Sequence, residues 1–225
     1  MIGGSRTLQH WEVPDDKNLA KRVLREGGVD VLMVSPHMLL PDEGIDNFTK
    51  LGLEKNPKLR VLVQASWPAR DGNLTGEFHN LMRNDATVES LRKLRDLQRD
   101  QWLKQLEAQV TALNAAAGKE AVHIVPVGDA VFALRERVIE GQAPGITKQA
   151  DLFKDDLGHP MPALSVLVTY CHFAAIYQRS PVGLPVPAAL QGAPQAAELN
   201  ALLQVLAWDA VTGYPMSGVK TAALQ

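Results

Sequence analysis

Three short apolar runs recur along the chain, and each is bounded by glycine, proline or polar residues. They cover residues 29–35, 59–66 and 122–127. Apolar runs of about four to eight residues with such boundaries are typical of strands buried on both faces of a parallel sheet. Helical periodicity fills the segments between and after these runs. The alternation predicts an α/β fold with a mostly parallel sheet.

The predicted helices have apolar positions three and four residues apart, which is the spacing of one helical face. The longest begins at Asp85 or Thr87 and ends near residue 117, because Gly118 stops it. A helix from about residue 161 to 178 is apolar nearly all round and is expected to be well buried. Other helices are expected at about residues 15–26, 41–56, 128–139 and 196–212.

The remaining segments suggest how the chain is organised. A long polar loop is expected over residues 69–84, and loops of this length are usually functional or mobile. A proline-rich connector follows Ser180 and reaches about Pro194. We therefore expect one α/β domain over residues 1–180, with residues 181–225 supplying a connector and a C-terminal helix that packs on the same domain.

Composition narrows the class of protein. The 225 residues are 46% hydrophobic and 21% charged with a formal net charge of −2, as expected for a globular protein with one sizeable core. The absence of a basic patch argues against nucleic-acid binding. No apolar run reaches the roughly 18 residues of a membrane span, so no membrane partner is expected. No signal peptide precedes Gly3, but the abrupt start is compatible with a missing export signal, so both cytoplasmic and exported locations stay open.

One stretch combines side-chain types and spacing that suggest chemistry. Asp156 and His159 stand three residues apart, and Pro160 follows directly. The residue before a proline is pushed out of helical geometry, so His159 is expected to be extended at the start of a helix. A carboxylate folded back onto the imidazole would fix its tautomer and leave the other ring nitrogen as a general base. The alternative is a loop histidine beside a helix-capping aspartate.

The motif Asp156-Leu-Gly-His159-Pro160, the apolar helix after it and the segment Tyr177-Gln-Arg-Ser180-Pro-Val-Gly-Leu184 resemble the C-terminal end of SGNH/GDSL-type serine hydrolase domains. In that family an Asp-x-x-His block supplies two members of a Ser-His-Asp triad. The resemblance covers roughly residues 2–180 and suggests a bacterial branch. It implies a three-layer α/β/α, flavodoxin-like fold and hydrolysis of an ester (O-acyl) bond, in acylated carbohydrate or another small molecule, without a cofactor.

The resemblance leaves the nucleophile open. The segment Gly3-Gly4-Ser5 resembles the family's second block, in which Gly4 or Gly3 would donate to the oxyanion. The nucleophile block and the first strand would then lie upstream of Met1. In a rival interpretation Ser5 is itself the nucleophile of a degenerate block. In a third, the N-terminus is rich in glycine but has no function.

The family's third block is also altered. Residues 35–38 are Ser-Pro-His-Met where the family has Gly-x-Asn-Asp, so another donor such as His37 or Gln64 would be needed. One missing oxyanion donor can cost about 100- to 1000-fold in rate. His37 facing solvent is the alternative. Trp67 is a candidate for the wall of an acyl or sugar site, although burial in the core is the usual role of tryptophan.

The sequence carries four further expectations. An SGNH-like sheet that lacks an internal first strand would expose an open edge, so the protein should be marginally stable, form a homodimer through that edge or have repacked. The altered blocks also favour a second function class, a truncated or degenerate non-catalytic domain that binds a ligand or partner. No metal site is expected, because His10, His79 and His123 lack ligand spacing. Cys171 is expected to be a buried, inert thiol.

Overall fold

The computed structural model describes residues 5–220, which pack as two compact units. The first unit comprises the chain up to Ala65 together with Gln101–Val125. The second comprises Ser66–Asp100 together with the chain from Pro126 onward. The chain therefore passes from one unit to the other three times, after Ala65, after Asp100 and after Val125.

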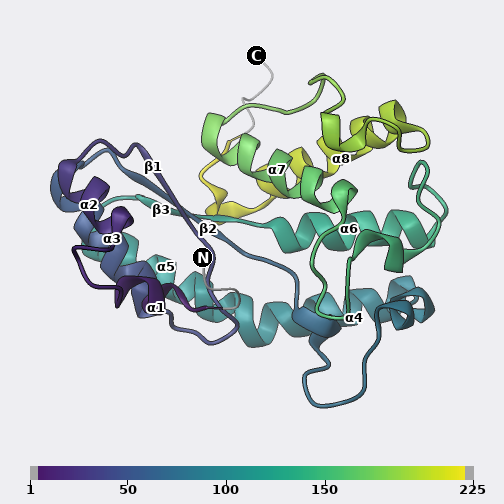
Figure 1. The fold of residues 1–225 in the computed structure, drawn as a ribbon, viewed down its shortest axis with the longest axis horizontal. Coiled ribbons are helices and arrows are strands. Elements are labelled where there is room, and N and C mark those ends of the chain that lie inside the picture. Colours follow the sequence, from purple (N-terminus) through teal and green to yellow (C-terminus); the bar gives the residue numbers. More distant parts are fainter. Residues whose placement is uncertain (1–4, 221–225) are drawn as a thin grey trace. The chain divides into compact units, whose positions relative to one another are not determined.

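The described part of the first unit contains a parallel sheet of three strands, β1 (Val31–Val34), β2 (Arg60–Gln64) and β3 (Val122–Val125) (Figure 1). Their order is β1-β2-β3, with β2 in the centre. All four residues of β3 are buried, whereas β1 is only partly buried. The predicted α/β class with a parallel sheet is confirmed, and the three apolar runs of the sequence are its strands.

The helices of the first unit are α1 (Thr7–Trp11), α2 (Leu19–Glu26), α3 (Glu43–Lys55) and α5 (Lys104–Ala117). The carboxylate of Asp42 is completely buried and accepts hydrogen bonds from the backbone of both α1 and α3. Gly44 allows this close approach, because a Cβ there would lie 2.2 Å from the Leu8 nitrogen. This contact fixes the start of the described chain, where Ser5 lies.

The second unit is helical around α6 (Val127–Ile139). This helix packs against α4 (Val88–Gln98), α7 (Pro162–Tyr177) and α8 (Ala196–Gly213). Both α7 and α8 are rich in small and apolar residues, and they form the largest helix-to-helix contact (Figure 1). Short 3-10 helices lie at Ala69–Gly72, Asn80–Asp85, Gln149–Leu152, Ala188–Leu190 and Pro215–Ser217.

One sequence expectation needs refinement. The helix predicted to run to residue 117 is α4 and α5 joined by a π-helical turn at Arg99–Leu103, and the boundary between the units falls inside this turn. Residues 181–225, predicted to supply a connector and a C-terminal helix, lie in the second unit, where α8 packs on α6 and α7. Within residues 5–220, no helix has both the length and the apolar character needed to span a membrane.

Candidate functional site

The predicted catalytic histidine lies on a closed loop directly before α7. Residues 153–160, here called the histidine loop, are closed by an antiparallel bridge between Phe153 and Pro160. The Lys154 N–H donates to the His159 carbonyl at 2.7 Å, and the Met161 N–H donates to the Leu152 carbonyl at 2.9 Å. The proline that excludes His159 from the helix therefore also takes part in closing the loop.

The imidazole of His159 is paired with a carboxylate, as predicted, but the residue is Asp155. His159 Nδ1 lies 2.6 Å from Asp155 Oδ2, and Asp155 Oδ1 accepts the N–H groups of Gly158 and His159. The hydrogen bond from His159 is the main reason why the pKa of the Asp155 carboxyl is lowered. The expected pairing of His159 with Asp156 is therefore corrected by one residue.

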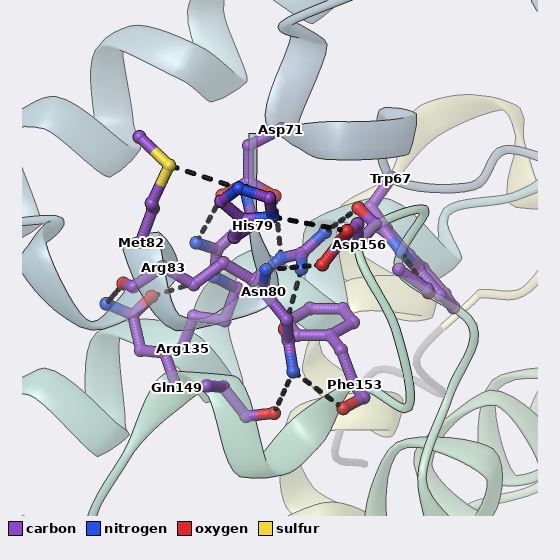
Figure 2. Close-up of polar contacts among 12 residues, drawn as sticks. Trp67, Asp71, His79, Asn80, Met82, Arg83, Arg135, Gln149, Phe153 and Asp156 are labelled. Atoms are coloured by element: carbon purple, nitrogen blue, oxygen red, sulfur yellow. Dashed lines mark hydrogen bonds and ion pairs between the residues drawn. The ribbon is translucent and has the colours of Figure 1, made fainter. Parts of the chain in front are cut away.

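Asp156 has a different set of partners. Its Oδ1 accepts the Asn80 N–H at 2.7 Å, and its Oδ2 lies 3.6 Å from His79 Nδ1 (Figure 2). The other ring nitrogen of His79 lies 3.0 Å from Glu77 Oε1. The hydrogen bond with Glu77, followed by the charge of Asp156, raises the pKa of His79. Asp156 thus joins the histidine loop to the segment that precedes the 3-10 helix Asn80–Asp85.

Two buried arginines lie beneath this loop and share one carboxylate. Asp71 binds Arg83 Nε at 3.2 Å and Arg135 Nη2 at 2.7 Å, and both arginines are only 1% exposed. We call Asp71, Arg83 and Arg135 the arginine cluster (Figure 2). The Arg83 guanidinium also lies 4.4 Å from the ring centre of Phe153. Burial lowers the pKa of Arg83, and the adjacent Asp71 charge opposes this effect.

The arginine cluster is connected directly to the histidine loop. Arg83 Nη1 donates to the carbonyl of Asp155 at 3.2 Å, and Arg83 Nη2 donates to that of Asp156 at 3.0 Å. Asn80, whose Oδ1 accepts from Arg83 at 2.6 Å, donates through its amide to the carbonyls of Ala150 and Phe153. The backbone carbonyls of Phe153, Asp155 and Asp156 therefore each accept a hydrogen bond from a buried or half-buried side chain.

Unusual backbone geometry supports these contacts. Arg70 and Asp71 both adopt left-handed conformations, with φ of +51° and +49°. Such residues each cost on the order of 1–3 kcal/mol and are found preferentially at functional sites. Gly158 has φ of +98°, and a Cβ there would lie 3.2 Å from both Arg83 Nη2 and Trp67 Nε1. Only glycine fits this position without moving its neighbours.

Trp67, expected to line a substrate site, has a different contact. Its Nε1 donates to the Gly158 carbonyl at 3.1 Å, and its half-buried ring lies 6.2 Å from that of Phe153. The indole therefore holds the histidine loop through its polar edge. This contact does not test its role toward a substrate, which stays a prediction.

The other predicted site residues lie in the first unit. The hydroxyl of Ser5 is half-buried and lies 2.6 Å from His10 Nε2. His37 is also half-buried; its Nδ1 accepts the Leu39 N–H at 3.4 Å, and its carbonyl accepts from Trp102 Nε1. Gln64 is the half-buried last residue of β2. Gly3 and Gly4, the predicted oxyanion donors, lie outside the described residues.

Among residues 5–220, no three His, Cys, Asp or Glu side chains form a group that could hold a metal ion. Cys171 is completely buried in α7, and burial raises the pKa of its thiol to about 12, so it is a poor nucleophile at neutral pH.

Sequence reasoning missed Asp155, Asn80 and the two buried arginines. Asp155 is adjacent to the predicted Asp156, and spacing alone does not decide which carboxylate turns toward the ring. Arg83 and Arg135 resemble ordinary surface cations in the sequence. Comparison of the chain with protein-family models, with curated proteins and with solved structures finds no match. The functional assignment therefore depends on the geometry of the site.

Proposed function

We propose that this protein is an SGNH-type hydrolase that cleaves an ester (O-acyl) bond, with His159 as general base and acid. The observation that supports this most directly is the 2.6 Å contact between Asp155 and His159 Nδ1. His159 is 63% exposed, and its Nε2 has no hydrogen-bond partner among the described residues. An imidazole held at one nitrogen and open at the other is the arrangement that general-base catalysis requires.

In this proposal Nδ1–H donates to Asp155, and the unprotonated Nε2 removes the proton of an attacking hydroxyl. Asp155 stabilises the imidazolium that forms, and His159 then returns the proton to the leaving alkoxide. A positioned acid–base group of this kind typically contributes about 100- to 10,000-fold in rate. The resemblance in the Asp156–Pro160 motif favours an ester as substrate, in acylated carbohydrate or another small O-acyl compound.

Ser5 is the nucleophile candidate that the described chain offers. Its hydroxyl already contacts His10, so His10 is a second candidate for the base that activates it. His37 and Gln64 are proposed to act toward the oxyanion, and Gly4 or Gly3 is the corresponding backbone donor. These assignments rest on the family resemblance, whereas the role of His159 also rests on its contact with Asp155.

A second candidate function is a non-catalytic SGNH-like domain that binds a ligand or partner. Two observations favour it. Residues 35–38 lack the asparagine of the family's third block, and the Asp155–His159 pair is exposed, as in many ion pairs that only stabilise loops. In that case the hydrogen-bonded histidine loop is a binding surface and His159 performs no proton transfer.

Two measurements distinguish the hydrolase from the non-catalytic binding domain. They are the hydrolysis of short-chain p-nitrophenyl esters and labelling with a fluorophosphonate probe. We expect the full chain to show both, and Ser5→Ala and His159→Ala to lose both. His10→Ala tests the alternative base, and Ser165→Ala, on α7, is the matched control that should retain activity. If the wild-type protein neither hydrolyses the esters nor takes up the probe, the hydrolase proposal is rejected and the binding domain is favoured.

A further inference from the structure

The side chain of His159 has little to hold it in place. It is 63% exposed, and its one side-chain hydrogen bond within residues 5–220 is to Asp155, which is itself 40% exposed. Solvent-exposed pairs of this kind contribute little free energy, and their geometry is easily lost. The position of the imidazole must therefore be determined by the backbone that carries it.

That backbone is held through the carbonyl of each residue from 155 to 158. The carbonyls of Asp155 and Asp156 accept from the guanidinium of Arg83, at 3.2 and 3.0 Å. The carbonyl of Gly158 accepts from Trp67 Nε1 at 3.1 Å. The carbonyl of Leu157 accepts from the N–H of Arg70 in the left-handed turn. Four consecutive peptide carbonyls before His159 thus have a donor.

Arg83, which supplies two of these hydrogen bonds, is itself firmly held. Arg83 is 1% exposed, its Nε is fixed by Asp71, and the rings of Phe78 and Phe153 lie 4.8 and 4.4 Å from its guanidinium. The planar fork of an arginine can hold two acceptors in fixed directions, which the point charge of a lysine cannot do. Figure 2 shows Arg83 between Asp71 and the segment that contains Asp156.

Stability alone is a weak explanation for this arrangement. A buried ion cluster contributes less to stability than its number of contacts suggests, because each charge must be desolvated. The left-handed conformations of Arg70 and Asp71 add backbone strain. The buried charges and the left-handed backbone are both unfavourable, and both act on the segment that leads to His159. A role in positioning His159 therefore explains them together.

We propose that Arg83 and Trp67 are positioning residues that fix the histidine loop so that Asp155 meets His159 Nδ1. This inference rests on the proposed function, because it concerns the imidazole to which catalysis is assigned. Neither residue would touch the substrate in this role. In this role Trp67 acts on His159 through its hydrogen bond to the loop.

The test uses the full chain and the variants Arg83→Lys and Trp67→Phe. Arg92→Lys and Trp208→Phe are matched controls, since Arg92 pairs with Glu136 on the surface and Trp208 lies on α8. Nitrogen-15 NMR of the His159 ring gives the fraction of the Nδ1–H tautomer, and carbon-13 NMR of Asp155 gives the pKa of its carboxyl. Circular dichroism confirms that each variant is folded.

We expect both variants to lose part of the Nδ1–H tautomer and to raise the pKa of the Asp155 carboxyl toward that of an ordinary aspartate, while the controls change neither. Ester hydrolysis should fall about 10- to 100-fold in kcat with little change in KM, as expected from a misplaced catalytic group. If a folded Arg83→Lys or Trp67→Phe protein keeps the wild-type tautomer and Asp155 titration, the proposal is overturned. Should Arg83→Lys fail to fold, Trp67→Phe alone decides.

The NMR readouts separate this inference from the proposed function, because they need no turnover. A protein without esterase activity, in which both variants still alter the His159 tautomer, retains the positioning role and rejects the hydrolase. An active esterase in which neither variant alters the tautomer retains the hydrolase and rejects the positioning role.

Discussion

The second unit contains two hydrogen-bonded groups built around an aspartate, and they differ chiefly in burial. In the arginine cluster, Asp71 is 13% exposed and its two arginines are buried. In the other group, Asp155 and His159 are 40% and 63% exposed. Breaking a buried ion group leaves a charge without compensation, whereas an exposed pair is screened by solvent. Removing one member of the first group is therefore costly to the fold, and the second group is open to solvent, as the proposed proton transfer requires.

The difference also shows how an exposed residue can be held in place. The pair itself stabilises the protein little, so its geometry is supplied by the buried cluster through backbone carbonyls. Substitutions in each group test whether the buried cluster supports the fold and whether the exposed pair carries the proposed chemistry.

The largest effect is expected for Asp71→Ala. Removing this carboxylate leaves two buried guanidinium groups without their shared counter-ion, so the free energy of unfolding should fall by about 3–5 kcal/mol. Urea unfolding followed by circular dichroism measures this change. Asp209→Ala, an exposed position on α8, is the control and should change stability by less than about 0.5 kcal/mol. Equal effects of the two substitutions would show that the arginine cluster does not support the fold.

A smaller loss is expected for Gly158→Ala. The new methyl group meets Arg83 Nη2 and Trp67 Nε1 at 3.2 Å, in addition to the strain of a positive φ. Gly192→Ala separates the two contributions, because Gly192 has a similar φ of +89° but no atom within 4 Å of a Cβ. We expect a loss of about 1–3 kcal/mol at Gly192 and a larger one at Gly158. Similar losses at the two glycines would mean that the histidine loop is not tightly packed against its donors.

The Asp155–His159 pair should make the stability of the folded protein depend on pH in the acidic range. Because the pKa of Asp155 is lower in the folded protein, its contribution to stability is present above its unfolded pKa and disappears as the pH falls through the folded pKa. The wild type should therefore be more stable than Asp155→Asn at about pH 5, by at most roughly 1 kcal/mol, and the difference should shrink toward about pH 2.5. A difference that grows in acid would contradict the observed pairing.

The smallest effect is expected at His79, with the opposite pH dependence. Its pKa is raised in the folded protein, so its contribution is present below the unfolded pKa of about 6.5 and is lost as the pH rises through the folded pKa. The melting temperature of the wild type should exceed that of His79→Gln at about pH 5.5 and match it at about pH 9. An advantage that increases with pH would argue against the contacts with Glu77 and Asp156.

Much of the secondary structure could be predicted from the sequence, because burial of a short strand or a helix face leaves a periodic pattern. The run at residues 122–127 is entirely apolar except for His123, and it forms the fully buried β3. The apolar segment after His159 forms α7, with its boundaries within one residue of the expected ones. What the pattern did not reveal is that the long helix changes to π geometry at Arg99–Leu103.

The site was harder to predict, because its contacts join segments that are distant in the sequence. Arg83 lies 72 positions from Asp155, whose carbonyl it binds, and nothing local distinguishes it from an exposed arginine. The choice between Asp155 and Asp156 depends on how the loop turns at Gly158, whose positive φ lets Asp155 accept from two backbone N–H groups. The position of His159 before the helix could be predicted, because a following proline has a strong local effect on the backbone.

The roles of the two aspartates are tested most sharply by comparing Asp155→Asn with Asp156→Asn in the hydrolysis of a short-chain p-nitrophenyl ester. The two residues are neighbours of the same type, and of the two Asp155 contacts the imidazole of His159. We expect Asp155→Asn to lower kcat by about 100-fold or more, because an amide favours the wrong tautomer, while Asp156→Asn stays within about tenfold of the wild type. If Asp156→Asn is the inactive variant, or if the wild-type protein has no activity to lose, the assignment of His159 and Asp155 as the catalytic pair is wrong.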